Sequence, residues 1–183
     1  QRPVFKVVTG VSTGALMAPF AFLGQQGDHA LYQFYTTTGS RDIFALGEFV
    51  SIARQLLYGE AIADTSPLRR LIEQYVDDAL LREIALAHGR GRRLYIGTVD
   101  LDSQRFMVWN MGLIASSGHP DAPQLFRQVM LASAAIPVAF SPVLFDVEAG
   151  GRRYDEMHVD GGVFAHATCG SRSGETPRAR IST

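Results

Sequence analysis

The sequence predicts an α/β domain, and three observations support this fold class. A β-branched, apolar run from Val4 to Thr9 is closed by Gly10, which is typical of a short buried strand that enters a tight turn. Residues Thr13 to Leu23 follow as a buried helix, and strand-like and helical segments alternate further along the chain. The 183 residues, 46% hydrophobic and 19% charged, suffice for one domain with a sizeable core.

Apolar spacing and capping residues define the helical segments. The first is apolar on nearly every face, with Gly24 at the C′ position and Pro19 inside it, where proline removes a backbone hydrogen bond. Ser66 followed by Pro67 is typical of a helix start. The predicted helices are Thr13 to Leu23, Ile43 to Leu57, Ser66 to Val76, Asp78 to His88, and a last one from about Asp121 to the residue before Ile136.

Two hairpins are predicted in the second half of the chain. Leu94 to Val99 and Phe106 to Trp109 are strand-like and joined by a short polar loop. Val143 to Val147 and Tyr154 to Val159 flank the turn Ala149-Gly150-Gly151.

The composition changes after this second hairpin. From residue 165 to 183 the chain has small, polar and Arg residues without apolar periodicity, so it can neither complete a sheet nor cover one. We expect residues 1–163 to form the folded domain and 164–183 to be a disordered or aberrant tail. Because the chain begins with Gln1 rather than Met, we also expect it to be a piece of a longer protein.

Composition excludes several classes of function. A net charge of −1, from 17 basic and 18 acidic residues, argues against a nucleic-acid partner. Cys169 is the only cysteine and the five histidines lack zinc-site spacing, so no disulfide or metal site is predicted. The longest apolar stretch, Gly14 to Gly24, is well short of the roughly 20 residues that cross a bilayer. The sequence leaves compartment and oligomeric state undetermined.

One basic cluster has two interpretations. Arg90 to Arg93 contains three arginines around Gly91 and follows a predicted helix. It fits either a solvated helix-to-strand loop, which we favour, or a site for a phosphate headgroup.

The segment Gly10-Val11-Ser12-Thr13-Gly14 matches G-x-S-x-G, the nucleophile elbow. In such an elbow a serine lies on a strained turn between a strand and a helix, which exposes its hydroxyl, and the flanking glycines allow close backbone approach. A strand before the motif and a helix after it are predicted independently. Ser12 is therefore a candidate nucleophile, and a helix N-cap serine in a Gly-rich turn is the alternative.

A serine nucleophile needs a base, and the sequence offers Asp160. This carboxylate ends the strand Tyr154 to Val159, and Gly161 and Gly162 after it allow another loop to come close. An ordinary Asp-Gly-Gly turn is the alternative. Of the histidines, His158 shares a strand face with Asp160 but precedes it, against the usual order of a triad, and His166 lies in the tail.

Three motifs together resemble the patatin-like phospholipase family in order and spacing. They are the segment around the elbow up to Phe20, Ser133-Ala134-Ala135-Ile136-Pro137, and His158-Val159-Asp160-Gly161-Gly162. The resemblance implies a three-layer α/β/α fold, incomplete at both ends, with residues 1–163 as a partial catalytic domain. It also implies a lipid acyl hydrolase in which Ser12 is the nucleophile and Asp160 its base, without a histidine, a metal or an organic cofactor. The Ser133 to Pro137 motif would pack near the site without a catalytic role.

The resemblance carries further expectations about substrate and activity. The substrate is a lipid or other acyl ester, peripheral membrane contact is compatible with such a substrate, and the backbone N–H of Thr13 is the available oxyanion donor. The family's Gly-rich oxyanion loop lies upstream of the elbow, and this chain begins nine residues before Gly10. Since one oxyanion donor is worth roughly 2.7–4 kcal/mol, the fragment is expected to be feeble or inactive.

Two other functions stay open on the sequence. One is a Ser-His-Asp carboxylesterase that uses His158 or His166 on another α/β scaffold. The other is a non-catalytic domain that binds lipid or protein.

Overall fold

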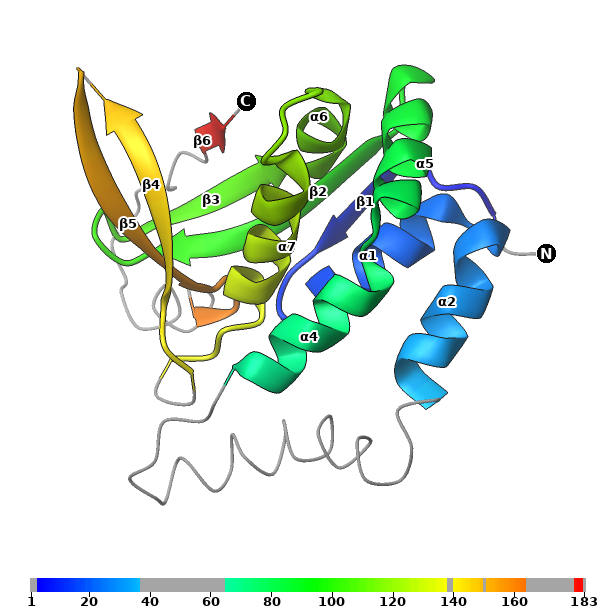
Figure 1. Cartoon of the computed structure of the whole chain (residues 1–183), viewed down its shortest axis with the longest axis horizontal. Helices are drawn as coiled ribbons and strands as arrows, with labels where there is room; N and C mark the ends of the chain where they lie inside the picture. The colour runs from blue at the N-terminus through cyan, green and yellow to red at the C-terminus, as the bar shows by residue number, and fades with distance from the viewer. Residues whose placement is uncertain (1–2, 37–64, 138–139, 150, 164–179, 183) are drawn as a thin grey trace, which may run out of the picture.

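The computed structural model describes residues 3–36, 65–137, 140–149, 151–163 and 180–182 (Figure 1). They contain a six-stranded mixed sheet in the order β4-β5-β2-β3-β6, with β1 paired to β2 off this path. The strands are β1 (Val7–Gly10), β2 (Arg93–Asp100), β3 (Arg105–Asn110), β4 (Val143–Ala149), β5 (Arg152–Asp160) and β6 (Arg180–Ser182). A mixed sheet with helices is the α/β class that the sequence predicted.

The two predicted hairpins are confirmed. β2 and β3 pair antiparallel with Val99 opposite Phe106, and β4 and β5 pair antiparallel with Val143 opposite His158. The last residues of β5, His158 to Asp160, also pair antiparallel with β2. This pairing joins the second hairpin to the central strand of the sheet.

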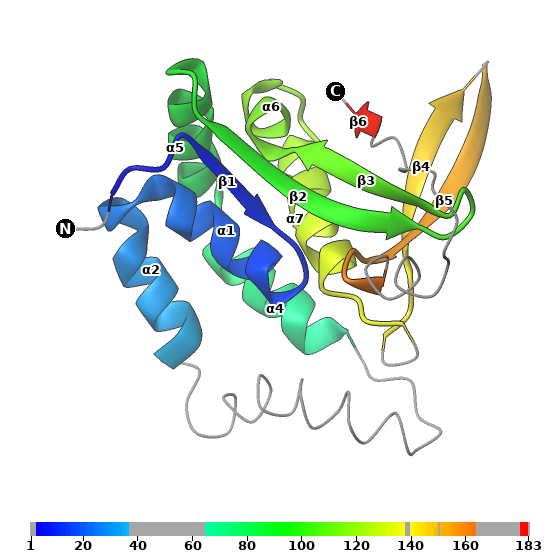
Figure 2. The ribbon, with the colours of Figure 1, turned by 180° about the vertical axis from the view of Figure 1, so that it is seen from behind.

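The helices are α1 (Thr13–Leu23), α2 (Gln25–Thr36), α4 (Ser66–Tyr75), α5 (Asp78–Gly89), α6 (Met111–Ser116) and α7 (Ala122–Ser133). Figure 1 shows α4 to α7 in front of the sheet, and Figure 2, from behind, shows β1, β2 and β3 nearest the viewer. These helices therefore cover one face. α1 packs with them, because its Leu16, Phe20 and Phe22 lie in one buried cluster with Ile84 of α5 and Phe126 of α7.

Local chemistry explains several helix ends. Gly24 after α1 has φ 70°, a positive value that glycine adopts without strain. The Asp77 carboxylate accepts a hydrogen bond from Leu80 N–H at 2.8 Å and caps α5. At α4 the predicted cap is shifted, because Thr65 is the N-cap and Ser66 is already helical.

The structure departs from the sequence expectations in three places. β1 is not a buried strand: Val7 is 56% exposed, because within the described residues β1 pairs only with β2 and the helices pack on one face. The sequence did not predict helices α2 and α6. Gly24 indicated a helix end, and the residues between Trp109 and Asp121 predicted no element. Residues Arg180–Ser182 pair with β3, so the prediction that the tail could not complete a sheet is wrong there. The predicted helix Ile43 to Leu57 and residues 164–179 lie outside the described residues.

Candidate active site

The carboxyl ends of β1 and β5 meet at one point on β2. β1 runs parallel to β2 and places Gly10 opposite Ile96, whereas β5 runs antiparallel and places Asp160 opposite Thr98. Both strands pair with the side of β2 that lies opposite β3. Their carboxyl ends therefore point toward each other and flank Gly97. The two predicted site segments, remote in sequence, are therefore neighbours.

The turn after β1 has the geometry of a nucleophile elbow. Ser12 has φ 57° and ψ −132°, and it is one of two non-glycine residues with positive φ in the described chain. A non-glycine residue in such a conformation costs on the order of 1–3 kcal/mol and must be held by its surroundings. Gly14 N–H donates to Val11 C=O and Ala15 N–H to Ser12 C=O, both at 2.9 Å, and these bonds close the turn into α1.

The Ser12 side chain does not act as a helix cap. Although Ser12 occupies the N-cap position of α1, its hydroxyl accepts no capping hydrogen bond. It instead lies close enough to the Asp160 carboxyl to lower the pKa of that group by hydrogen bonding. This contact favours the nucleophile interpretation over the N-cap alternative.

The two elbow glycines differ in their surroundings. A Cβ at Gly10 would lie 2.6 Å from Gly14 O and 2.8 Å from Ala18 Cβ, so no side chain fits between the strand and the helix. At Gly14 nothing in the described structure lies within 4 Å of such a Cβ. The expectation of close backbone approach is confirmed at Gly10, whereas at Gly14 the described residues leave open space around a Cβ.

Asp160 lies in a buried but hydrogen-bonded position. Only 4% of it is exposed, and its Oδ1 accepts a hydrogen bond from Gly162 N–H at 2.7 Å. Burial raises the pKa of the Asp160 carboxyl above its ordinary value, although the hydrogen bonds from Ser12 and Gly162 oppose that rise. A carboxylate that is partly desolvated is a stronger base than one in water, as proton abstraction from serine requires.

The two glycines after Asp160 serve different structural purposes. A Cβ at Gly161 would lie 2.8 Å from Gly97 O and 2.9 Å from Val11 Cγ1, so the end of β5 fits against β2 only without a side chain. Gly162 supplies the N–H that holds the carboxylate. Thr13, the predicted oxyanion donor, is the first residue of α1, and N–H groups in a first helical turn lack partners inside the helix.

The end of α7 holds both candidate residues by hydrogen bonds. Ser133, with no exposed surface, accepts a hydrogen bond from Ser12 N–H at 3.1 Å and donates one to Gly97 C=O at 2.7 Å. Two residues later Ala135 C=O accepts a hydrogen bond from Asp160 N–H at 2.8 Å. The sequence predicted proximity for this motif but no role for Ser133. The sequence feature that could have indicated a role for Ser133 is its position as the single polar residue in the apolar stretch Leu131 to Ala135.

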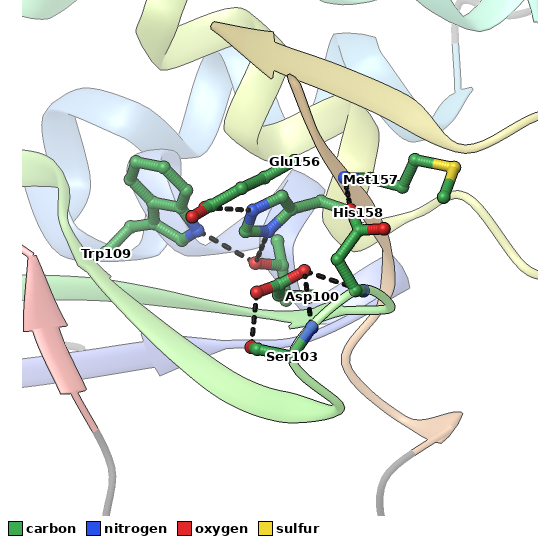
Figure 3. A network of polar contacts seen from close by, with 8 residues as sticks. Asp100, Ser103, Trp109, Glu156, Met157 and His158 are labelled. Carbon is green, nitrogen blue, oxygen red and sulfur yellow. Dashed lines mark hydrogen bonds and ion pairs between the residues drawn. The ribbon is translucent and has the colours of Figure 1, made fainter. Parts of the chain in front are cut away.

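His158 is buried in a separate polar network (Figure 3). Its Nδ1 lies 2.9 Å from Thr98 Oγ1, which also accepts a hydrogen bond from Trp109 Nε1 at 2.8 Å. Its Nε2 lies 3.4 Å from Glu156 Oε2. Both ring nitrogens face these partners rather than Ser12 or Asp160, so His158 is not placed as the histidine of a triad. His166 lies outside the described residues.

The arginine cluster after α5 is used largely for structure. Arg92 donates to Phe5 C=O at 2.9 Å and to Phe22 C=O, and Arg93 donates to His88 C=O at 3.0 Å. These bonds tie the loop to the chain before β1 and to the ends of α1 and α5. They favour a structural loop over a phosphate site.

Comparison with protein-family models gives a match to the patatin-like phospholipase model over residues 1–168. The chain belongs to the patatin-like phospholipase family. No curated protein matches it. The resemblance noted in the elbow, the Ser133 to Pro137 motif and the Asp160 motif is thus confirmed at the level of the family. The patatin-like family consists of lipid acyl hydrolases. In the described part of this patatin-like chain, no helix has the length and apolarity to span a membrane.

Proposed function

We propose that this patatin-like chain hydrolyses acyl esters of lipids through a dyad of Ser12 and Asp160. The observation that carries the proposal is that strand pairing brings Ser12, on a strained elbow, close enough to a buried Asp160 carboxyl to lower its pKa. Both ring nitrogens of His158, the histidine nearest in sequence to Asp160 among the described residues, face other partners.

The proposed reaction is acyl transfer in two steps. Asp160 takes the proton of the Ser12 hydroxyl as the oxygen attacks the ester carbonyl carbon. The bond from that carbon to the alkoxy oxygen then breaks, and Asp160 returns the proton to the leaving alcohol. Asp160 next takes a proton from water as the water oxygen attacks the acyl carbonyl carbon. The bond from that carbon to Ser12 Oγ then breaks, the fatty acid is released, and Asp160 returns the proton to Ser12.

The developing oxyanion needs hydrogen-bond donors. Thr13 N–H follows the nucleophile directly and lies at the positive end of α1, where negative charge is stabilised. We assign it to the oxyanion, as in other elbows where the residue after the nucleophile donates. A lipid or acyl ester is the proposed substrate, met by peripheral contact with a membrane or aggregate.

A serine-directed probe tests the dyad. The chain is treated with a fluorophosphonate, and the labelled residue is identified by mass spectrometry alongside hydrolysis of a short acyl ester. Labelling is expected at Ser12, to vanish in Ser12→Ala, and to fall by at least 10²-fold in Asp160→Asn. Ser116→Ala and Asp78→Asn remove an exposed hydroxyl and an exposed carboxylate elsewhere, and both are expected to react like the parent chain.

Histidine variants separate the dyad from a triad. His158→Gln, which keeps hydrogen-bonding groups in the buried network, and His166→Ala are expected to retain labelling within a few-fold. Loss of labelling in either folded variant would instead indicate a triad. A parent chain that the probe leaves unlabelled at Ser12 would contradict the proposed activity of this chain.

A further inference from the structure

Ser133 connects three elements through one buried hydroxyl. It is the last residue of α7, it receives the N–H of Ser12 at the start of α1, and it bonds to Gly97 on β2. The direction of both bonds is fixed by chemistry, because a backbone N–H only donates and a carbonyl oxygen only accepts. A serine hydroxyl has one proton and two lone pairs, so it satisfies both groups at once.

The hydrogen bond that Ser133 accepts comes from Ser12, the residue whose backbone is strained. The positive φ of Ser12 persists only if neighbouring structure fixes the peptide, and its N–H has no other partner among the described residues. Without the Ser133 hydroxyl, the partly buried Ser12 N–H and the buried Gly97 C=O would each lose a hydrogen bond. Relaxation of the Ser12 backbone out of its strained conformation would then move the nucleophilic oxygen.

The same helix end also fixes the base. Ala135 C=O holds Asp160 N–H, so two bonds from residues two positions apart set the backbones of Ser12 and Asp160 relative to each other. Ser133 itself has no hydrogen bond to the Asp160 carboxyl, whose partners are Ser12 and Gly162. Its effect is therefore on the position of the nucleophile and not on the basicity of Asp160.

We infer that Ser133 is a positioning residue, which holds Ser12 in its elbow by bridging Ser12 N–H to Gly97 C=O. Its catalytic consequence rests on the proposed dyad, but its hold on the Ser12 backbone does not. Two readouts therefore test it separately.

The first readout is hydrogen exchange of the Ser12 amide in the whole ¹⁵N-labelled chain. Ser133→Ala is expected to speed this exchange by about 10-fold or more relative to amides of β3, and Ser133→Thr, which keeps a hydroxyl, to restore protection. Asp77→Ala removes the α5 cap, far from the elbow, and controls for a general loss of stability. Ser12 protection equal to that of the parent in Ser133→Ala overturns the inference.

The second readout is the rate of fluorophosphonate labelling as a function of pH. Ser133→Ala is expected to slow labelling about 10- to 100-fold without moving its pH midpoint, since the base is untouched, and Ser133→Thr to recover most of the rate. An unchanged rate, or a shifted midpoint, overturns the positioning role. If the parent is not labelled at all, the proposed dyad fails, and the exchange measurement still decides whether Ser133 holds Ser12. If the Ser133→Ala chain does not fold, Ser133→Cys replaces it, because a thiol forms weaker hydrogen bonds than a hydroxyl. Faster Ser12 amide exchange and slower labelling are then expected to a smaller extent.

Discussion

At the scale of single residues, Asp160 experiences two opposing effects. Burial disfavours its charged form, while Ser12 and Gly162 donate hydrogen bonds that favour it, and the net result is a raised pKa. A raised carboxyl pKa means that the folded chain holds this proton more tightly than the unfolded chain. The contribution of Asp160 to stability is therefore greatest at low pH and is lost as pH rises through the folded-state pKa.

Asp160→Asn is expected to be more stable than the parent chain at pH 7. Its amide keeps the acceptor for Gly162 N–H and can donate to Ser12, but it carries no buried charge. The advantage in free energy of unfolding should shrink as pH falls toward about 4, the ordinary carboxyl range. Urea denaturation from pH 4 to 8 measures this, with the exposed Asp78→Asn as control. An advantage that grows toward low pH would contradict the raised pKa.

At the scale of elements, one side chain joins the segment before β1 to α1. The Arg92 guanidinium bonds to Phe5 C=O and Phe22 C=O and lies 4.3 Å from the centroid of the Phe22 ring. It thus satisfies a carbonyl at the end of α1 and packs on an aromatic face, as the planar guanidinium of arginine allows.

Arg92→Ala is expected to lower the free energy of unfolding by about 1–3 kcal/mol, because two carbonyls lose a charged donor and Phe22 loses packing. Arg90→Ala, at an exposed position two residues earlier, should change stability by less than about 0.5 kcal/mol. Thermal or urea unfolding compares them. Equal effects from both variants would show that Arg92 has no special structural role.

At the scale of the whole molecule, the candidate site depends on the head-on meeting of β1 and β5 at Gly97. Gly161→Ala would place a Cβ 2.8 Å from Gly97 O and 3.0 Å from Phe106 Cε2. Because backbone cannot move aside cheaply, we expect about 1–3 kcal/mol of destabilisation and a displaced Asp160, with labelling of Ser12 reduced about 100-fold.

Gly89→Ala is the matched control for Gly161→Ala. Nothing in the described structure lies within 4 Å of a Cβ at Gly89, so stability and labelling should stay close to those of the parent. Unfolding curves and labelling rates of the two variants test the junction. Labelling by Gly161→Ala at the parental rate would show that the meeting of the two strand ends is not required.

Local sequence patterns were sufficient to predict the class of fold, the two hairpins, four helices (α1, α4, α5 and α7) and the candidates Ser12 and Asp160. These follow from local chemistry: periodicity, capping and turn residues act over a few positions. Exposure of β1, the pairing of Arg180–Ser182 with β3, and α2 and α6 depended on tertiary packing instead.

The way in which the candidate residues meet depends on long-range packing and cannot be predicted from local patterns. Strand pairing brought Gly10 and Asp160 to the two sides of Gly97 and placed His158 next to Thr98, and the packing of α7 placed Ser133 next to Ser12. Each of these contacts joins segments far apart in the chain, and no local pattern encodes their register. Residue types specify what chemistry is available, whereas the pairing of remote strands specifies which groups can share a proton.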